Sequence, residues 1–155
     1  MSTFTAQEQF MQEALLLAKE AYLAGETPVG AVVVRGGEVI ARAENRRERE
    51  KDPTAHAEIL AIREAAQILQ RRRLMDCTLY VTLEPCPMCA GALVMAALGC
   101  CYFGARDKRQ GCVESIYALT REPSFCHRLP CIGGVLAQEV ETLMKGFFQE
   151  RRMSK

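Results

Sequence analysis

The sequence predicts an α/β fold in which helices cover a mixed β-sheet. Residues 29–35 and 38–43 are rich in strand formers and are joined by Gly36 and Gly37, which predicts an antiparallel hairpin. Further along the chain, strand-like and helix-like segments alternate, and crossover helices join strands that run parallel. The 155 residues are 49% hydrophobic and 25% charged, with neither a linker nor a repeat. We therefore expect one globular domain over residues 1–155.

Capping residues predict where the first two helices begin. Thr5 and Glu8 have the spacing of a capping box, and apolar residues follow them at helical intervals. Asp52 can cap a second helix with Pro53 at its first position, where the missing N–H is no loss, and this helix is expected to run to about Gln70.

The second half of the chain continues the alternation. Strands are expected where apolar residues alternate with polar ones, and helices where apolar residues recur every three or four positions. The expected elements are a strand at 78–83, a helix at 87–97, a strand at 101–105, a short helix at 115–120, a weak strand at 132–136 broken by Gly133 and Gly134, and a closing helix at 138–152.

Charge and hydropathy exclude several classes of protein. The net charge of +1 gives no global field that would draw the chain to a polyanion, so any such binding must be local. No apolar run approaches the ~20 residues needed to span a bilayer, and the N-terminal residues lack the pattern of a signal peptide. We expect a cytoplasmic protein with no membrane partner, in which cysteines serve as ligands, catalysts or small core residues.

One group of residues has the spacing of a zinc site. Cys86 and Cys89 lie three residues apart at the start of a predicted helix, so both sulfurs can face one point, and His56 adds a nitrogen ligand. Three protein ligands leave a fourth position open for water, which is typical of catalytic zinc. Zinc lowers the pKa of such a water towards ~7, and Glu58, two residues after His56, is then available to shuttle its proton.

The combined pattern His-x-Glu and Pro-Cys-x-x-Cys is the signature of zinc-dependent nucleobase deaminases. A Cys-x-x-Cys pair alone could also be a redox pair or half of a structural zinc site, but neither reading accounts for His56 and Glu58. The remaining cysteines show no second ligand set and are expected to be small buried residues, namely Cys77, Cys100, Cys101, Cys112, Cys126 and Cys131.

The likeness to a known family extends well beyond the zinc signature. The chain resembles the bacterial tRNA-specific adenosine deaminases from about Thr5 to Arg152. The segments that carry the likeness are ETPVGA (26–31), DPTAHAE (52–58), LYVTLEPCPMCAGA (79–92), FGARD (103–107) and FFQERR (147–152). The resemblance implies a cytidine deaminase-like three-layer α/β/α sandwich with a five-stranded mixed sheet, and a homodimer with one Zn²⁺ per subunit.

The resemblance also implies a reaction and a partner. The expected reaction converts adenosine to inosine at the wobble position of an arginine tRNA, and the partner is the anticodon stem-loop, whose base is flipped into the pocket. By the same resemblance Asn45 hydrogen-bonds the nucleotide, while Val29 and the loop around Asp107 line its surroundings.

Local clusters of basic residues could supply the contacts that the neutral total charge does not. They lie after the hairpin, near the end of the sheet and at the C-terminus, and comprise Arg46, Arg47, Arg49, Arg106, Lys108, Arg109, Arg151 and Arg152. Each could instead be a solvated face, because Glu48 and Glu50 interleave the first cluster.

One position departs from the family pattern and keeps two alternatives open. Cys126 precedes His127 where the family carries Asn-His, and a thiol cannot replace the paired donor and acceptor of an amide. The first alternative is a deaminase of a free base or nucleoside such as guanine. The second is a noncatalytic, zinc-stabilised RNA-binding module, in which Glu58 would have no purpose.

Overall fold

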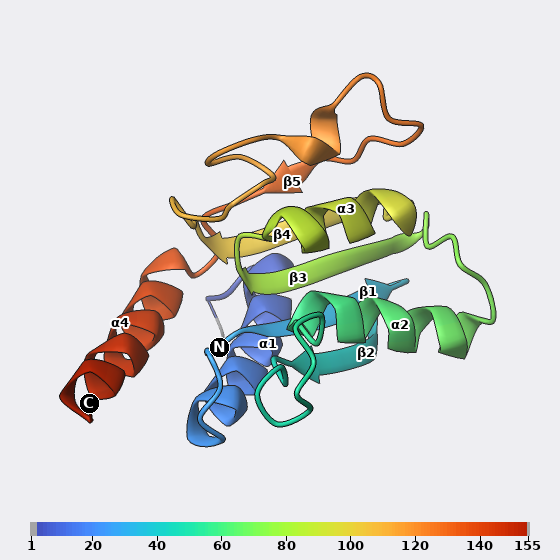
Figure 1. Cartoon of the computed structure of the whole chain (residues 1–155). Helices are drawn as coiled ribbons and strands as arrows, with labels where there is room; N and C mark the ends of the chain where they lie inside the picture. The colour runs from blue at the N-terminus through green and yellow to red at the C-terminus, as the bar shows by residue number, and fades with distance from the viewer. Residues whose placement is uncertain (1–2, 155) are drawn as a thin grey trace.

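The computed structural model describes residues 3–154 as an alternation of helices and strands (Figure 1). The elements are α1 (Ala6–Leu23), β1 (Gly30–Arg35), β2 (Glu38–Glu44), α2 (Ala57–Leu69), β3 (Cys77–Leu83), α3 (Pro87–Met95), β4 (Cys100–Ala105), the 3₁₀ helix η1 (Leu119–Arg121), β5 (Cys131–Ile132) and α4 (Ala137–Met153). Within these residues no helix combines the length and the apolar character needed to cross a bilayer.

The five strands form one mixed sheet in the order β2-β1-β3-β4-β5. The hairpin β1–β2 is antiparallel as predicted, and β1 also pairs antiparallel with β3. The α3 crossover makes β3 and β4 parallel, and β4 and β5 are parallel too. Because β1 lies between β2 and β3 and opposes both, β2 and β3 run in the same direction, and the helices that follow them begin at the same edge of the sheet.

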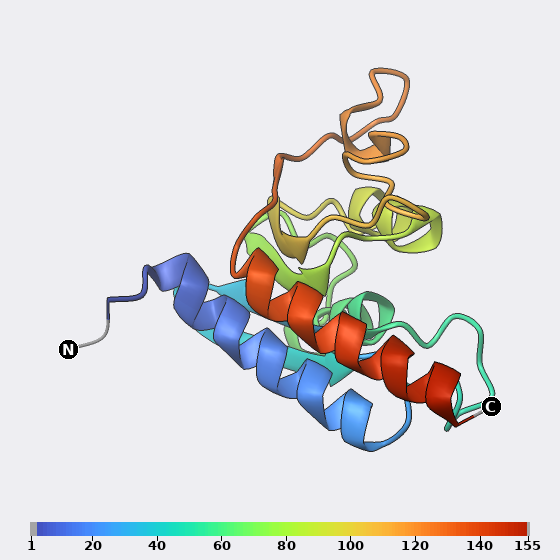
Figure 2. The same ribbon diagram turned by 90° about the vertical axis from the view of Figure 1, so that its left-hand side faces the viewer.

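Helices cover both faces of the sheet, which gives the predicted three layers. Figure 1 shows α2 and α3 along one face, and Figure 2 shows α1 and α4 side by side on the other. Central strand β1 is buried at five consecutive positions, as expected for a strand covered on both faces.

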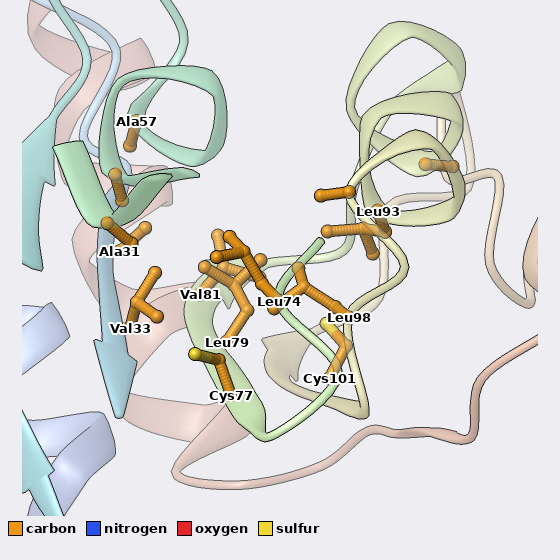
Figure 3. Packing of buried hydrophobic residues seen from close by; sticks show 14 of the residues in the cluster. Ala31, Val33, Ala57, Leu74, Cys77, Leu79, Val81, Leu93, Leu98 and Cys101 are labelled. Carbon is orange, nitrogen blue, oxygen red and sulfur yellow. The ribbon is translucent and has the colours of Figure 1, made fainter. Parts of the chain in front are cut away.

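The larger hydrophobic core lies between the sheet and the α2–α3 layer (Figure 3). Ala57, Ala61 and Ala65 present a small-residue face of α2, which lets the helix lie close to β1 and β2. Leu93 of α3 and Phe103 of β4 belong to the same cluster. This close packing fixes the beginnings of α2 and α3, where the predicted zinc ligands lie.

The predicted start of the second helix is wrong. The helix begins at Ala57, with His56 as its N-cap, rather than at Pro53. The side chain of Asp52 accepts hydrogen bonds from the backbone N–H and the hydroxyl of Thr54, at 2.8 and 2.7 Å. These bonds close a local turn. An aspartate side chain can cap either a turn or a helix N-terminus, so the sequence pattern alone does not distinguish the two.

The predictions for the segment after β4 are also partly wrong. Residues 115–120 do not form a helix, and only η1 is helical there. The strand expected at 132–136 is the two-residue β5, because Gly133 lies against the ring of Phe103, where a side chain would overlap it, and Gly134 takes a positive φ of 93°. The other elements agree with the predictions to within a few residues at their ends.

We expect Gly30 to be indispensable for the packing of α1 on the sheet. A methyl group there would overlap the carbonyl oxygen of Ala14 and lie 2.7 Å from the backbone nitrogen of Ala18. Gly30→Ala should therefore lower the free energy of unfolding by about 1–3 kcal/mol, measured by urea denaturation. The matched control is Gly91→Ala in α3, where nothing lies within 4 Å, and it should raise stability by about 0.5–1 kcal/mol. Equal effects of the two substitutions would contradict this packing.

Candidate metal centre and the cleft around it

Two helix N-termini bring the predicted zinc ligands together. His56 is the N-cap of α2, and Cys86 is the N-cap of α3, with Cys89 in the first turn. Both N-caps have extended backbone angles, and neither side chain caps its helix. Their side chains are therefore free to face each other. Pro87 takes the first position of α3, where its fixed φ suits the helix and no N–H is lost.

The three donor atoms have the spacing that tetrahedral zinc requires. The Sγ atoms of Cys86 and Cys89 each lie 3.6 Å from Nδ1 of His56, and all three atoms lie within 4.8 Å of one another. Zinc bonds of about 2.3 Å to sulfur and about 2.0–2.1 Å to nitrogen at a tetrahedral angle place sulfur and nitrogen about 3.6 Å apart. These residues therefore fit the ion, and they form the only such group among residues 3–154.

Hydrogen bonding within the triad prepares its ligands. A hydrogen bond from Cys89, supported by one from His56, lowers the pKa of Cys86 to about 4. The same bond to Cys86, followed by burial, raises the pKa of Cys89. The hydrogen bond to Cys86 also raises the pKa of His56. The sulfurs thus hold one proton between them, which a divalent cation displaces on binding.

Glu58 lies beside the triad without belonging to it. It is in the first turn of α2, is 3% exposed and lines the same cleft as His56 and Cys86. Burial raises the pKa of its carboxyl to about 7. A group with this pKa can both take up and release a proton near neutral pH. The geometry therefore supplies a general base and acid next to the predicted open zinc position.

A cleft of about 1090 Å³ opens over the triad. All of the residues predicted from the resemblance line it, since Val29, Asn45 and Asp107 all reach its surface together with His56 and Glu58. The first wall is the segment after β2, at residues 45–49, and the second wall is the segment after β4, at residues 106–115. The structure thus brings together the seven predicted site residues from five separate stretches of the chain, six of them at the cleft surface and Cys89 buried beneath.

Asn45 is held in place by the first wall. Its side-chain amide donates to the carbonyl of Thr27 at 3.2 Å and accepts from the backbone N–H of Arg47 at 3.3 Å. The wall itself is fixed by Glu26, which is fully buried and accepts hydrogen bonds from the backbone N–H groups of Glu48 and Arg49, at 3.0 and 2.9 Å. Glu26 is thus a buried anchor for the segment that follows Asn45.

Asp107 stands in the second wall, and local contacts use part of its side chain. Its Oδ1 accepts from the backbone N–H groups of Arg109 and Gln110, at 3.0 and 3.2 Å. This bonding shapes the turn that follows β4. Asp107 therefore reaches the cleft as predicted, while one of its carboxylate oxygens is already occupied.

Members of all three predicted basic clusters converge on the cleft. Ion pairs within the fold neutralise Arg46 and Arg49, because both contact Glu44 and Arg49 also contacts Glu26. Arg106 pairs with Glu114 at 2.9 Å. The basic residues that line the cleft are Arg47, Arg106, Lys108, Arg109, Lys145, Arg151 and Arg152. The cleft rim is consequently basic although the whole chain is nearly neutral.

Sequence reasoning pointed only to the end of α4, at Arg151 and Arg152, and missed the contribution of its middle. Met144, Lys145 and Phe148 line the cleft from one face of this helix. The amphipathic pattern of the segment predicts a helix with one face packed on the core. Such a pattern does not predict which other residues of the helix line a neighbouring cleft. Glu84, which also lines the cleft, stood within the quoted motif without an assigned role.

The remaining cysteines are only partly as predicted. Cys77, Cys101 and Cys112 are buried, whereas Cys100 and Cys131 are half-buried. Cys126 is exposed, so the prediction that it is a core residue is wrong. Its neighbour His127 is fixed by a contact of 2.8 Å between Nε2 and the carbonyl oxygen of Leu98.

Comparison with known proteins agrees with the site. Residues 4–105 match the family described as the cytidine and deoxycytidylate deaminase zinc-binding region. The chain is therefore a zinc-binding deaminase of the cytidine deaminase-like fold. It is 47% identical over 151 residues to the tRNA-specific adenosine deaminase of Bacillus subtilis (strain 168), spanning 97% of this chain and 94% of the relative. The chain belongs to the family of tRNA-specific adenosine deaminases.

Solved structures support the same assignment. A structure from work on A-to-I editing by tRNA:A34 deaminases at the wobble position is 42% identical, with a TM-score of 0.84 over 87% of this chain and 98% of that chain. A guanine deaminase from Bacillus subtilis is also 42% identical, but its TM-score is 0.62 over 68% of this chain and 66% of that chain. The tRNA deaminase structure thus matches more of this chain than that guanine deaminase does, while a guanine deaminase from Nitrosomonas europaea, 24% identical, shares the fold with a TM-score of 0.79 over 94% of this chain.

We expect Glu26 to stabilise the first wall only while it is ionised. Burial would raise the pKa of its carboxyl, but the hydrogen bonds from Arg49 and Glu48 outweigh burial and lower it. Its contribution is therefore full above the unfolded pKa of 4.5 and is lost as pH falls through the lower, folded value. Glu26→Gln should lower the free energy of unfolding by about 1–3 kcal/mol at pH 7. Urea denaturation of both proteins should show this difference shrinking below pH 4.5; a difference that stays constant would contradict the assignment.

Proposed function

We propose that this protein is a zinc-dependent hydrolase that deaminates adenosine to inosine at the wobble position of a tRNA anticodon loop. The observation that carries the proposal is the arrangement of a tetrahedral donor triad beside a buried, near-neutral carboxyl at the floor of a basic cleft. The tRNA-specific adenosine deaminase of Bacillus subtilis supports the choice of substrate.

In this proposal His56, Cys86 and Cys89 hold the zinc ion. Zinc in such a site acts as a Lewis acid that makes water nucleophilic near neutral pH. The chain supplies three ligands, so its own residues leave one position for water and substrate. The placement of Cys86 at the N-cap of α3 favours its thiolate form, because the helix dipole is positive there, and Cys89 gives up its proton when the ion binds.

Glu58 is the proposed catalytic residue. Deamination requires water to add to C6 of adenine and the bond from C6 to the exocyclic nitrogen to break, with release of ammonia. Glu58 takes a proton from the water and delivers a proton to the departing amine. A pKa of about 7 suits both transfers, because the same group must act as base and then as acid.

The size and charge of the cleft favour RNA over a free base. Binding sites for drug-sized ligands measure about 300–1,000 Å³, and a single base needs only the lower part of that range. The volume of about 1090 Å³ leaves room for flanking nucleotides. Its basic rim suits phosphate groups, and bases in a single-stranded loop can be splayed into such a pocket. Asn45, Val29 and Asp107 are the proposed contacts to the flipped nucleotide.

Three further parts of the proposal rest on the resemblance. They are the homodimer with one zinc ion per subunit, the cytoplasmic location and the arginine tRNA. The single domain over residues 1–155 also stays a prediction.

A paired substrate assay tests the choice of substrate. The wild-type protein should convert adenosine to inosine in an anticodon stem-loop, scored by nucleoside mass spectrometry, and should release no ammonia from free guanine. The reason is that the basic rim binds the RNA backbone, which guanine lacks. Ammonia from guanine without inosine in the stem-loop would support the free-base deaminase and exclude the tRNA reaction.

Substitution of Glu58 separates an enzyme from a zinc-stabilised RNA-binding module. Glu58→Ala should retain one zinc ion per chain, measured by elemental mass spectrometry, and lose activity by about 10²–10⁴-fold because the proton shuttle is removed. The matched control is Glu141→Gln, an exposed carboxylate of the same cleft, which should keep most of its activity. A wild-type protein that binds the stem-loop tightly but deaminates nothing would contradict the enzymatic proposal.

A further inference from the structure

Glu84 joins the metal-binding segment to the second wall of the cleft. It follows β3 and stands two residues before Cys86, and it is 2% exposed. Its carboxylate accepts hydrogen bonds from the backbone N–H of Asp107 at 3.0 Å and from the backbone N–H groups of Glu114 and Ser115, at 2.9 and 2.8 Å. The hydroxyl of Ser115 donates a fourth bond. Residues near both ends of the second wall (106–115) are thus hydrogen-bonded to one side chain.

These four bonds leave the carboxylate no capacity for chemistry. Oε1 accepts from Asp107 and from the Ser115 hydroxyl, and Oε2 accepts from the Glu114 and Ser115 backbone. A carboxylate has about four lone-pair sites, so all of them are used. Within residues 3–154 no basic side chain forms an ion pair with Glu84. Its charge is therefore balanced by N–H and O–H dipoles, and its role is to order the chain around it.

The second wall has no regular structure of its own, so its path is fixed by anchors such as Glu84 and by the burial of Cys112 and Val113 in the core. Residues 106–118 contain neither helix nor strand, and most of their side chains are exposed. A second bond, from the backbone N–H of Cys112 to the carbonyl of Pro85 at 2.8 Å, ties the middle of the wall to the same motif. Gly111 lies directly against the carboxylate, where a methyl group would overlap it. Asp107, Gly111, Glu114 and Ser115 of the second wall thus all contact the carboxylate of Glu84.

We propose that Glu84 is a positioning residue that holds the 106–115 wall at a fixed distance from the metal centre, so that Asp107 and the basic residues beside it meet the RNA substrate. This inference rests on the proposed function. Lys108 and Arg109 lie on the same wall and line the cleft, so an unanchored wall would bind substrate less well. Glu84 is not among the donors of the triad, so the proposal assigns it no contact with the metal.

Glu84→Gln tests the proposal with little change in shape. The amide retains one acceptor oxygen and turns an NH₂ group towards donors, so at least two of the four bonds are lost. We expect KM for the anticodon stem-loop to rise roughly tenfold or more, with kcat within about threefold of wild type and one zinc ion per chain retained. Amide hydrogen exchange should become faster at 107, 114 and 115 and remain slow in β3 and β4.

Two further variants reach the same anchor from the wall itself. Ser115→Ala removes a single donor and should raise KM by a smaller factor, whereas Gly111→Ala pushes a methyl group into the carboxylate and should raise it more. The matched control is Glu13→Gln, which loses only the exposed ion pair with Arg42, where neither residue lines the cleft. Its KM should stay close to that of wild type. These variants test the proposal even if Glu84→Gln fails to fold.

The outcomes separate this proposal from the proposed function. Faster exchange with an unchanged KM would make Glu84 merely structural and overturn the proposal, and so would loss of zinc or a fall in kcat alone. A wild-type protein that produces no inosine in the stem-loop would instead overturn the proposed function. In that case the exchange pattern of Glu84→Gln still decides whether the carboxylate anchors the wall.

Discussion

The architecture of the site depends on two helices that begin at the same edge of the sheet. Strands β2 and β3 run in the same direction with β1 between them, so α2 and α3 begin beyond the carboxyl ends of these strands. In α/β folds this edge is where ligands bind. His56 and Cys86 are the N-caps of the two helices, and their donor atoms therefore meet although 30 residues separate them. The alanine face of α2 matters for function because it sets the position of His56.

Three buried glutamates show how the surroundings of one side chain decide its role. Glu26 and Glu84 are surrounded by N–H donors, which outweigh the effect of burial and lower the pKa of both carboxyls. Both stay charged and each anchors a wall of the cleft. For Glu58 burial dominates and raises the pKa to about 7, so its proton is mobile at neutral pH. The same type of side chain therefore serves a structural role where its pKa is lowered and a chemical role where its pKa is raised towards neutrality.

The sequence predicts the hairpin and the helices α1, α3 and α4 well because their signals are local. The spacing of Cys86 and Cys89, for instance, places both sulfurs near one point in any helix that begins there. The predictions are wrong where distant contacts compete with local patterns. The segment 115–120 lacks a helix because its N–H groups bond elsewhere: that of Leu119 bonds to the carbonyl of Cys112 instead of to that of Ser115, four residues earlier. The expected strand at 132–136 is short because Gly133 lies against Phe103.

The geometry of the bound metal tests the central claim most directly. X-ray absorption spectroscopy of the zinc-loaded protein should show two sulfur neighbours at about 2.3 Å and two lighter neighbours at about 2.0–2.1 Å, one nitrogen from His56 and one oxygen that the chain does not supply. The lighter shell should change when a substrate analogue is added, because that position is open. A shell of three or four sulfurs, or one unchanged by the analogue, would make the site a closed structural centre and contradict the account.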